Sequence, residues 1–393
     1  MQRESVAQAQ KPDWTSLPQL NSARAPTKTI FATDEWFATC DNLNRVEEPV
    51  FDPDAFDFQG KVMDGWESRR RREAGHDWCI MKLGLSGVIK GFEVNTAFFT
   101  GNQVPRVSIQ AVCLSQDINV LPEWNSKPRK GTKASPEEHA AIAKINSEAW
   151  DEIVPMSPLA PGYADCCKHY FPVNDERRFT HIRINYGPDG GIARIRCHGE
   201  VKVDWKQLIQ AHAGNPVDLL ASQNGGLGLM ASNSHYGTPQ NMLGFGRGVN
   251  MGDGWETARN PNRPPKFKTD ANGMMELPGF DWCVLQLGTA GIVQALEIDT
   301  LHFKGNYPES FMMDGCFAPS ATRTTFNPDA VQWTPLIKRT RLGPDAVHKF
   351  DQSSGLTPPP SPITHVRLTI YPDGGVSRVH LWGRPTPEAL SKI

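Results

Sequence analysis

Residues 77–102 read DWCIMKLGLSGVIKGFEVNTAFFTGN, and residues 281–306 read DWCVLQLGTAGIVQALEIDTLHFKGN. Aligned without gaps at an offset of 204, the two stretches share 11 of 26 residues, far more than unrelated segments would share. The chain is therefore a tandem duplication. A comparison of its two copies separates residues that hold a common scaffold from residues that distinguish one copy.

Three further segments recur in the same order. Ala32–Leu43 corresponds to Ala231–Met242, Asp64-Gly65-Trp66-Glu67 to Asp253-Gly254-Trp255-Glu256, and Pro188-Asp189-Gly190-Gly191 to Pro372-Asp373-Gly374-Gly375. The offset rises from 189 after Asp-Gly-Trp-Glu to 204 at Asp-Trp-Cys, so copy 2 carries a 15-residue insertion. The insertion falls in the Pro- and Lys-rich stretch 261–279, whose composition predicts a surface loop.

Short alternating strands dominate both copies. Residues 92–98 and 296–302 alternate with period 2, which predicts half-buried strands, and Pro-Asp-Gly-Gly predicts hairpin turns. Helices are few: a capping box at Ser135–Glu138 leads into 140–150, and 204–212 reads as a linker helix. The pattern predicts an all-β protein of two tandem antiparallel β-sandwiches. The expected boundaries are a tail at 1–24, repeat 1 at 25–203, a linker at 204–215, repeat 2 at 216–385 and a tail at 386–393.

Composition and net charge limit which binding partners and which cellular compartment are expected. The net charge of −2 and the pI of about 6.6 argue against nucleic acid, and no apolar run is long enough to span a membrane. Eight cysteines without a Cys-x-x-Cys pair predict reduced thiols in an intracellular protein. We expect a cytoplasmic location, with peroxisomal import as the alternative, because Ser391-Lys392-Ile393 is close to a Ser-Lys-Leu address.

The mismatches between the copies point to copy 2 as the functional one. Trp36 corresponds to His235 and Phe98 to His302, so at these two positions copy 2 has a titratable imidazole where copy 1 has an aromatic ring that does not titrate. Either histidine alone could be a structural residue at the edge of the domain with its hydrogen bonds satisfied. Because two such changes occur together, a functional role and a structural role explain them about equally well. Asn95 also becomes Asp299, and copy 2 has Glu309 after Pro308. In a regular strand His302 would face away from both Glu297 and Asp299, so no His302–Glu297 dyad is expected.

The Asp-Gly-Trp-Glu segments contain the other candidates. Asp64 and Asp253 suit a turn in which carboxylates bind backbone amides. Glu67 and Glu256 lie near Arg70 and Arg259, and a Glu beside an Arg could move protons while the Arg binds a carboxylate. The sequence lacks metal, phosphate-loop and nucleophile-elbow motifs.

These residues together resemble the allantoicase family of ureide hydrolases. The resemblance rests on residues 63–67, 251–257 and 302–310, on Asn224-Gly225-Gly226 leading to His235-Tyr236-Gly237, and on both Pro-Asp-Gly-Gly turns. It covers residues 25–385, and the insertion resembles that of fungal members. Two departures stand out: Asn233 replaces the more usual Asp, and Ala258 interrupts the arginines after Glu256. Activity would be weakened if either position carried catalysis.

The resemblance implies two jelly-roll domains of the galactose-binding-like type, a homo-oligomer, and hydrolysis of allantoate to (S)-ureidoglycolate and urea. Our hypothesis assigns acid–base catalysis and substrate binding to nine residues. They are Glu256, His302, Glu309 and His235 for catalysis, and Arg259, Arg70, Glu67, Asn306 and Asp299 for binding. No cofactor is certain, although Asp299, His302 and Glu309 could offer ligands to a divalent metal. The alternatives are a non-catalytic carbohydrate-binding tandem, with Trp36 or Trp333 as a platform, and a structural tandem with one inactive copy.

Overall fold

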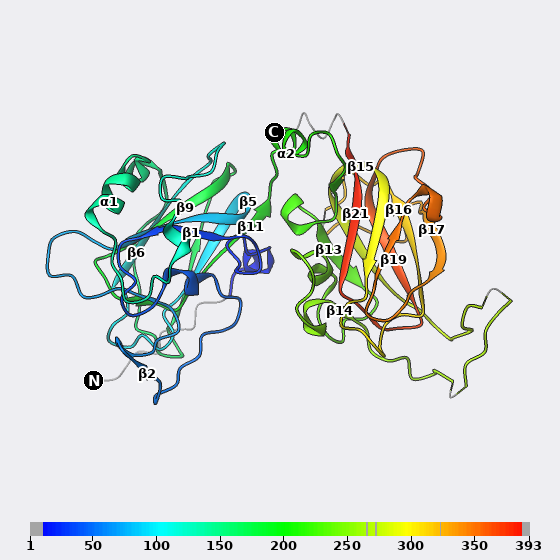
Figure 1. Cartoon of the computed structure of the whole chain (residues 1–393), viewed down its shortest axis with the longest axis horizontal. Coiled ribbons are helices and arrows are strands. Elements are labelled where there is room, and N and C mark those ends of the chain that lie inside the picture. The colour runs from blue at the N-terminus through cyan, green and yellow to red at the C-terminus, as the bar shows by residue number, and fades with distance from the viewer. Residues whose placement is uncertain (1–10, 265, 272, 323, 387–393) are drawn as a thin grey trace. The chain divides into compact units, whose positions relative to one another are not determined.

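The computed structural model divides the chain into two compact units, Met1–Lys202 (unit 1) and Val203–Ile393 (unit 2) (Figure 1). It describes residues 11–264, 266–271, 273–322 and 324–386. The terminal Ser-Lys-Ile and the predicted C-terminal tail beyond residue 386 lie outside the described residues. Of the helices in these ranges, none is both long and apolar enough to cross a membrane.

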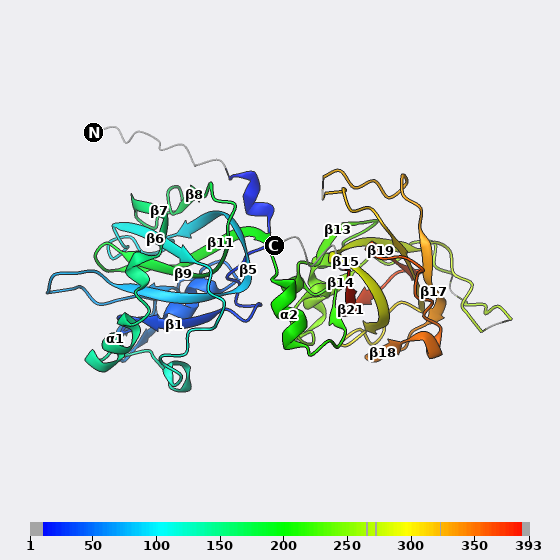
Figure 2. The ribbon, with the colours of Figure 1, turned by 90° about the horizontal axis from the view of Figure 1, so that it is seen from above.

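Unit 1 is an antiparallel β-sandwich built around one long strand, β5 (Trp78–Asn95). The first part of β5 pairs with β1 (Lys28–Ala32) and β9 (Arg178–Tyr186), and the second part pairs with β8 (Lys168–Pro172) and β11 (Arg194–Val201). β6 (Arg106–Val112) and β7 (Asp151–Pro158) extend the first layer beyond β9. Figure 2 shows β6, β9 and β1 following one another across the unit. The strand that revealed the duplication therefore belongs to both layers.

Unit 2 repeats this plan around β15 (Asp281–Asp299). The first layer pairs β15 with β13 (Leu227–Ala231) and β19 (Ile363–Tyr371), and continues to β16 (Ser310–Cys316) and β17 (Thr334–Arg341). The second layer pairs β15 with β18 (Val347–Phe350) and β21 (Arg378–Pro385), and β12 (Val217–Asp218) pairs with β21. The all-β expectation of two duplicated jelly rolls is confirmed.

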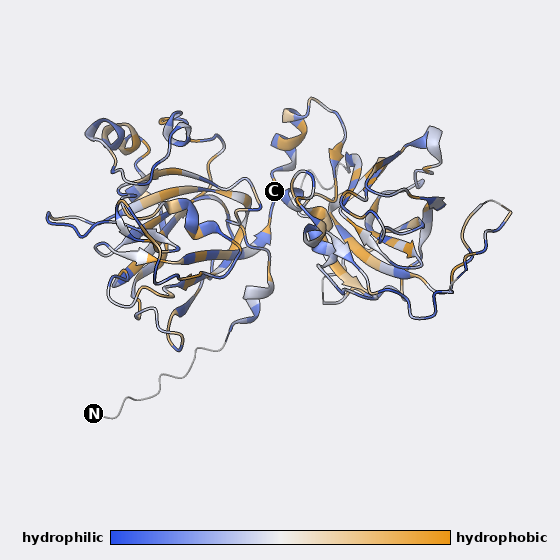
Figure 3. Ribbon diagram, turned by 60° about the horizontal axis from the view of Figure 1, so that its bottom comes forward, coloured by the Kyte–Doolittle hydropathy of each residue, from blue (hydrophilic) through white to orange (hydrophobic). Residues whose placement is uncertain are grey.

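Two features of the sequence position the strands. Apolar and polar residues alternate along them, and glycines stand where two backbone segments come close together. Apolar residues such as Val94, Ile184 and Leu368 are fully buried between the layers, and the orange and blue residues along the strands in Figure 3 reflect this alternation. Where β5 passes from one layer to the other, a Cβ on Gly87 would lie 2.1 Å from the carbonyl oxygen of Glu200. At the equivalent Gly291 a Cβ would lie 3.0 Å from the carbonyl oxygen of Arg384.

The helices are short and lie outside the sandwiches. Helix α1 (Pro136–Ala143) has the predicted capping box but ends before residue 150, and the 3-10 turn η4 (Ser147–Ala149) follows it. Helix α2 (Trp205–Ala211) lies where the linker helix was predicted, with Asp204 at its N-cap. All eight cysteines are free thiols, and Cys79 and Cys283 are fully buried, as expected for small apolar side chains.

The prediction of an unpacked tail is wrong for residues 11–24, while residues 1–10 lie outside the described range. Leu20 and Asn21 are fully buried, and the Asn21 side chain donates to the carbonyl oxygen of Ile195 (2.7 Å). The Trp14 ring lies against Tyr170 and covers Gly91, where a Cβ would be 2.6 Å from the indole. In unit 2 the equivalent residue is Ala295, and the same face has a cavity of about 280 Å³.

Candidate active site

Each Asp-Gly-Trp-Glu segment forms a two-residue strand against the Pro-Asp-Gly-Gly turn. β4 (Trp66–Glu67) pairs with β10 (Gly191–Ile192), and β14 (Trp255–Glu256) pairs with β20 (Gly375–Val376). Trp66 and Trp255 are fully buried, and each indole N–H donates to a backbone carbonyl, of Asp34 (2.8 Å) and Asn233 (2.9 Å) respectively. The tryptophans thus fix the strand so that the following glutamate reaches the edge of each sandwich.

The aspartates of these segments hold the scaffold. Asp64 Oδ2 accepts from the Arg194 guanidinium (2.6 Å) and from the backbone N–H of Val50 (3.0 Å). Asp253 repeats the arrangement with Arg378 at 2.8 Å. Burial acts to raise the pKa of Asp64, but the hydrogen bonds from Arg194 and Val50 and the charges of Arg194 and Arg45 together outweigh it, so the pKa lies below its usual value. The structural interpretation of both aspartates agrees with these contacts, and each has a buried arginine as partner.

The glutamates instead form one short bond to an asparagine. Asn102 Nδ2 donates to Glu67 Oε1 at 2.6 Å, and Asn306 Nδ2 donates to Glu256 Oε1 at 2.6 Å. Burial raises the pKa of Glu67, and the Asn102 bond only partly opposes this. Asn306, predicted to anchor substrate, therefore orients the carboxylate of Glu256. Sequence comparison missed the equivalent role of Asn102, although both asparagines end the repeated Asp-Trp-Cys to Gly-Asn stretch.

Arg70 and Arg259 occupy equivalent positions three residues beyond these glutamates. Both are exposed, and neither has a hydrogen bond or an ion pair to another residue of the described ranges. Both are therefore free to bind an anion, which is the role predicted for them. The segment that carries them is held in place, because Asp189 accepts from the backbone N–H of Arg71 (3.0 Å) and Asp373 from that of Asn260 (2.8 Å).

The two departures from the family pattern form one contact. In unit 1 the Arg69 guanidinium donates to Asp34 Oδ2 at 2.7 and 2.8 Å and lies 4.5 Å from the centre of the Trp36 ring. Unit 2 has Asn233 and Ala258 at the positions of Asp34 and Arg69, so both members of the ion pair have been replaced together. Asn233 Oδ1 still accepts from the backbone N–H of Ala258 (2.9 Å), as Asp34 does from that of Arg69 (3.2 Å).

His235 is the predicted catalytic histidine that lies beside a glutamate. It is exposed, its backbone N–H donates to the carbonyl oxygen of Glu256 (3.0 Å), and its ring stands edge-on to Tyr236 with centroids 4.4 Å apart. In unit 1 the equivalent Trp36 is half-buried beneath Arg69. Unit 2 therefore has an imidazole on one backbone segment, and a carboxylate and a free guanidinium on a second segment that is hydrogen-bonded to the first.

His302 and Asp299 make other contacts. β15 ends at Asp299, so His302 lies in the turn beyond the strand, with φ of 72°, and the predicted strand 296–302 is three residues too long. The His302 Nε2 lies 2.8 Å from the carbonyl oxygen of Gly248, and its backbone N–H donates to Asp345. Asp299 accepts from the backbone N–H of Leu301 (2.8 Å), as Asn95 does from that of Ala97 (2.9 Å). These contacts close the turn and hold the loop before Asp253.

Phe98 shows the same structural role in unit 1. It too lies beyond its strand with a positive φ of 70°, and its ring stacks on Phe51 with centroids 5.6 Å apart. Position 98 or 302 thus fixes the loop that precedes Asp-Gly-Trp-Glu, by stacking in unit 1 and by a hydrogen bond in unit 2. This mismatch between the copies has a structural explanation.

Glu309 anchors the insertion. Its buried carboxylate lies 3.1 Å from the Arg339 guanidinium and 3.6 Å from that of Arg341, and it accepts from the backbone N–H of Met275 (3.1 Å). Arg339 also donates to the carbonyl oxygen of Met275 (3.1 Å). No hydrogen bond or ion pair among the described residues joins Glu309 to Glu256, His235 or His302. The structure therefore brings together Glu256, Asn306 and His235, and places Glu309 in a different contact.

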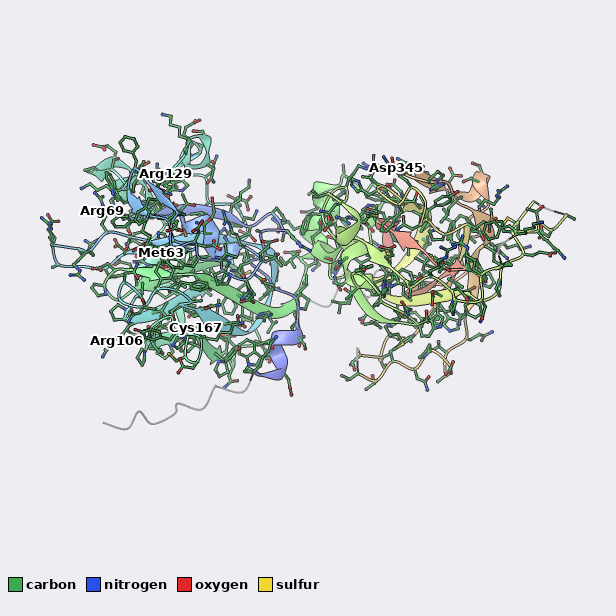
Figure 4. The ribbon with its side chains drawn as sticks, turned by 90° about the horizontal axis from the view of Figure 1, so that it is seen from below. Met63, Arg69, Arg106, Arg129, Cys167 and Asp345 are labelled. Carbon is green, nitrogen blue, oxygen red and sulfur yellow. The ribbon has the colours of Figure 1, made fainter. Side chains whose placement is uncertain are left out.

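Unit 1 contains a titratable residue that the comparison of copies missed. Glu35 is buried, burial raises its pKa to about 7, and its Oε1 accepts from the backbone N–H of Cys40 (2.8 Å). Its other oxygen lies 3.5 Å from Arg129 Nε, and Figure 4 shows Arg129 on the same side of unit 1 as Arg69. Ser234 stands at this position in unit 2, and applying the mismatch test to all polar residues would have found it.

Metal-ligand side chains do not gather in the part of the chain that is described. No group of three or more His, Cys, Asp or Glu side chains there could hold a metal ion. Asp299, His302 and Glu309, the set suggested by the sequence, each have the separate partners given above. Acid–base chemistry with an anion-binding arginine is the chemistry that this arrangement supports.

The chain is similar to allantoicases in sequence and in structure. The family model of the allantoicase repeat matches residues 18–202 and 217–386. A probable allantoicase of Pseudomonas aeruginosa strain UCBPP-PA14 is 38% identical over 366 residues, covering 93% of this chain and 95% of the relative. One of Acinetobacter baumannii strain ACICU is 36% identical over 365 residues, covering 93% of each. The crystal structure of allantoicase from Saccharomyces cerevisiae is 31% identical with a TM-score of 0.64, covering 94% of this chain and 93% of that one.

Proposed function

Because the chain belongs to the allantoicase family, we propose that it is a hydrolase that converts allantoate and water to (S)-ureidoglycolate and urea. The observation that supports this most is the match of both repeats to the family over nearly the whole chain. The carbohydrate-binding alternative has no comparable support. The fold alone does not distinguish an enzyme from a binding module, so the residues of the site must also fit the reaction.

Allantoate sets three chemical requirements. Its central carbon carries a carboxylate and two ureido groups, and hydrolysis replaces one ureido group by a hydroxyl. The enzyme must bind the carboxylate, donate a proton to the departing ureido nitrogen and remove a proton from the attacking water. The products are one urea and one ureidoglycolate, and the two proton transfers balance.

The residues of unit 2 meet these requirements. Arg259 is exposed and free among the described residues, and its guanidinium suits a carboxylate. Glu256 and His235 are two titratable groups linked through one backbone hydrogen bond, so one can donate a proton while the other accepts one. Asn306 is a positioning residue, because its bond to Glu256 Oε1 leaves the second carboxylate oxygen to act on substrate.

His302, Asp299 and Glu309 support the site from outside it. His302 and Asp299 fix the turn and the loop that lead into Asp253, and Glu309 fixes the insertion. A loss of activity on replacing them would arise through the position of the loop. This revises the sequence-based assignment, in which His302 and Glu309 were acid–base groups.

The decisive experiment measures urea release from allantoate by variants of unit 2. We expect Glu256→Gln and His235→Phe each to lower kcat by about 10²-fold or more, the usual contribution of an acid–base group. Glu276→Gln is the matched control, because Glu276 is an exposed carboxylate of the insertion. Wild-type turnover in both site variants would refute the assignment. Absence of any turnover in the unmodified protein would refute the proposed activity.

A homo-oligomer is the second part of the proposal. The loop before Asp64 in unit 1 exposes Phe56 (65%) and Phe58 (104%), and exposed aromatic groups of this kind are typical of contact surfaces. Light scattering after size-exclusion chromatography tests this part. We expect a mass that is a multiple of 43.6 kDa, and a single-chain mass would contradict it.

A further inference from the structure

Unit 1 keeps most of the site found in unit 2. The carboxylate–amide pair has the same 2.6 Å bond in both units, the glutamate pairs with a glycine of the same turn, and a free, exposed arginine follows at the same spacing. Arg70 forms no hydrogen bond or ion pair with the described residues that would stabilise the scaffold of unit 1, so a structural role does not explain why an arginine is present here as it is at Arg259. The two sites differ mainly in the ring beside the glutamate, Trp36 against His235.

Unit 1 also has two buried side-chain acceptors that can take further hydrogen bonds. Gly191 pairs with Glu67 on one side and bridges to Gln103 on the other, so these two residues flank the same turn. The Gln103 side-chain oxygen is buried and has no hydrogen-bond partner among the described residues. Glu67 is buried, its Oε1 accepts from Asn102 (2.6 Å), and it forms no ion pair with a basic residue there. Buried acceptors cost free energy unless a donor reaches them, so this turn favours a ligand rich in N–H groups.

The remaining surroundings fit a planar anion. Trp36 is half-buried, the Arg69 guanidinium lies 4.5 Å from the centre of its ring, and Arg70, the next residue along the chain, is free to bind a carboxylate. A ureide acid combines a carboxylate with planar N–H donors, which matches a guanidinium next to two acceptors. A neutral sugar would leave Arg70 without its anion.

We propose that unit 1 is a second binding site for ureide acids, in which Glu67 and Gln103 accept ureido N–H groups and Arg70 binds the carboxylate. This inference rests on the proposed function, because it takes the ligand class from unit 2. The site binds without hydrolysing. Hydrolysis needs one group to protonate the leaving nitrogen and another to deprotonate water, and unit 1 has Trp36 where unit 2 has the His235 imidazole.

The test counts ligands by isothermal titration calorimetry with ureidoacetate. This probe has a carboxylate and one ureido group on a methylene carbon, so it has no second nitrogen on that carbon to help expel urea. We expect two equivalents per chain in the unmodified protein, one in Arg70→Ala, one in Arg259→Ala and none in the double variant. Arg72→Ala should bind two, because it removes an exposed charge from the same basic run. All these arginines are exposed, so the variants should keep the fold, which thermal unfolding checks.

The binding and turnover measurements test the second site in unit 1 and the activity of unit 2 separately. One equivalent in the unmodified protein, or two in Arg70→Ala, overturns the second site. Turnover of allantoate by Arg259→Ala tests the first site separately, with an expected fall in kcat/KM of at least tenfold. A wild-type rate in that variant would overturn the placement of catalysis in unit 2 and would leave the count of equivalents as an independent result.

Discussion

Restoring an ion pair in unit 2 gives the sharpest test of the duplicated geometry. Unit 1 pairs Asp34 with Arg69, whereas unit 2 has Asn233 and Ala258, with the backbone bond between these positions unchanged. We therefore expect Asn233→Asp and Ala258→Arg together to rebuild the pair. Each substitution alone should change stability by less than about 0.5 kcal/mol, as surface substitutions usually do.

The size of the effect follows from the exposure of the pair in unit 1. The Arg69 side chain is 36% exposed and that of Asp34 11%, so solvent screens the attraction. Two donors 2.7 and 2.8 Å from one oxygen place the coupling near the upper end for exposed pairs, at about 1 kcal/mol. In a domain of this size such a gain raises Tm by about 2–4 °C.

Calorimetric unfolding of the four members of the double-mutant cycle measures the coupling. The reverse cycle, Asp34→Asn with Arg69→Ala, should lose a similar coupling from unit 1. If the two substitutions in unit 2 add within about 0.3 kcal/mol, the geometry is not shared between the units and the reasoning fails.

Three further predictions concern titration and the insertion. Burial raises the pKa of Glu35 to about 7, so its contribution to stability is present below about pH 4.5 and is lost as the pH rises through 7. Glu35→Gln should therefore gain up to about 3 kcal/mol over the unmodified protein between pH 5 and 8 in urea unfolding, and an equal difference at both pH values would contradict this. Burial lowers the pKa of His365 to about 4, so stability is lost as the pH falls from 6.5 through 4. His365→Phe should flatten that acid limb in the same assay, and an unchanged limb would exclude the histidine as its cause. Glu309→Ala removes the carboxylate that holds Met275, so trypsin should cleave within 261–279 faster; an unchanged rate would show that the anchor lies elsewhere.

Much of the fold could be predicted because duplication supplied an internal alignment. It located β5 and β15, both hairpin turns and the insertion, and the local capping signals located α1. The ends of the strands could not be found this way. Alternation continues through Phe98 and His302, whereas the strands stop where Asn95 and Asp299 bind a backbone N–H two residues ahead. Period 2 reports which residues share a face and does not report where pairing ends.

The site was predictable in part for a related reason. Glu256, His235 and Arg259 lie on short segments whose local order survives in the sequence. The partners of His302 and Glu309 come from residues 54 and 30 positions away, at Gly248 and Arg339, and pattern alone does not show such contacts. A mismatch between the repeats therefore shows that the surroundings of a residue differ between the two units. Only the three-dimensional contacts show whether that residue takes part in catalysis or in packing.

Residues 11–24, which include Trp14, determine where the chain can be cut without loss of the core of unit 1. Leu20 and Asn21 complete the interior of unit 1, so a fragment that begins at residue 25 lacks a piece of its own core. A synthetic peptide of residues 11–24 should bind such a fragment and restore its cooperative unfolding. Unit 1 would then reassemble from two pieces, and the change in tryptophan fluorescence when the peptide with Trp14 is added would report the reassembly.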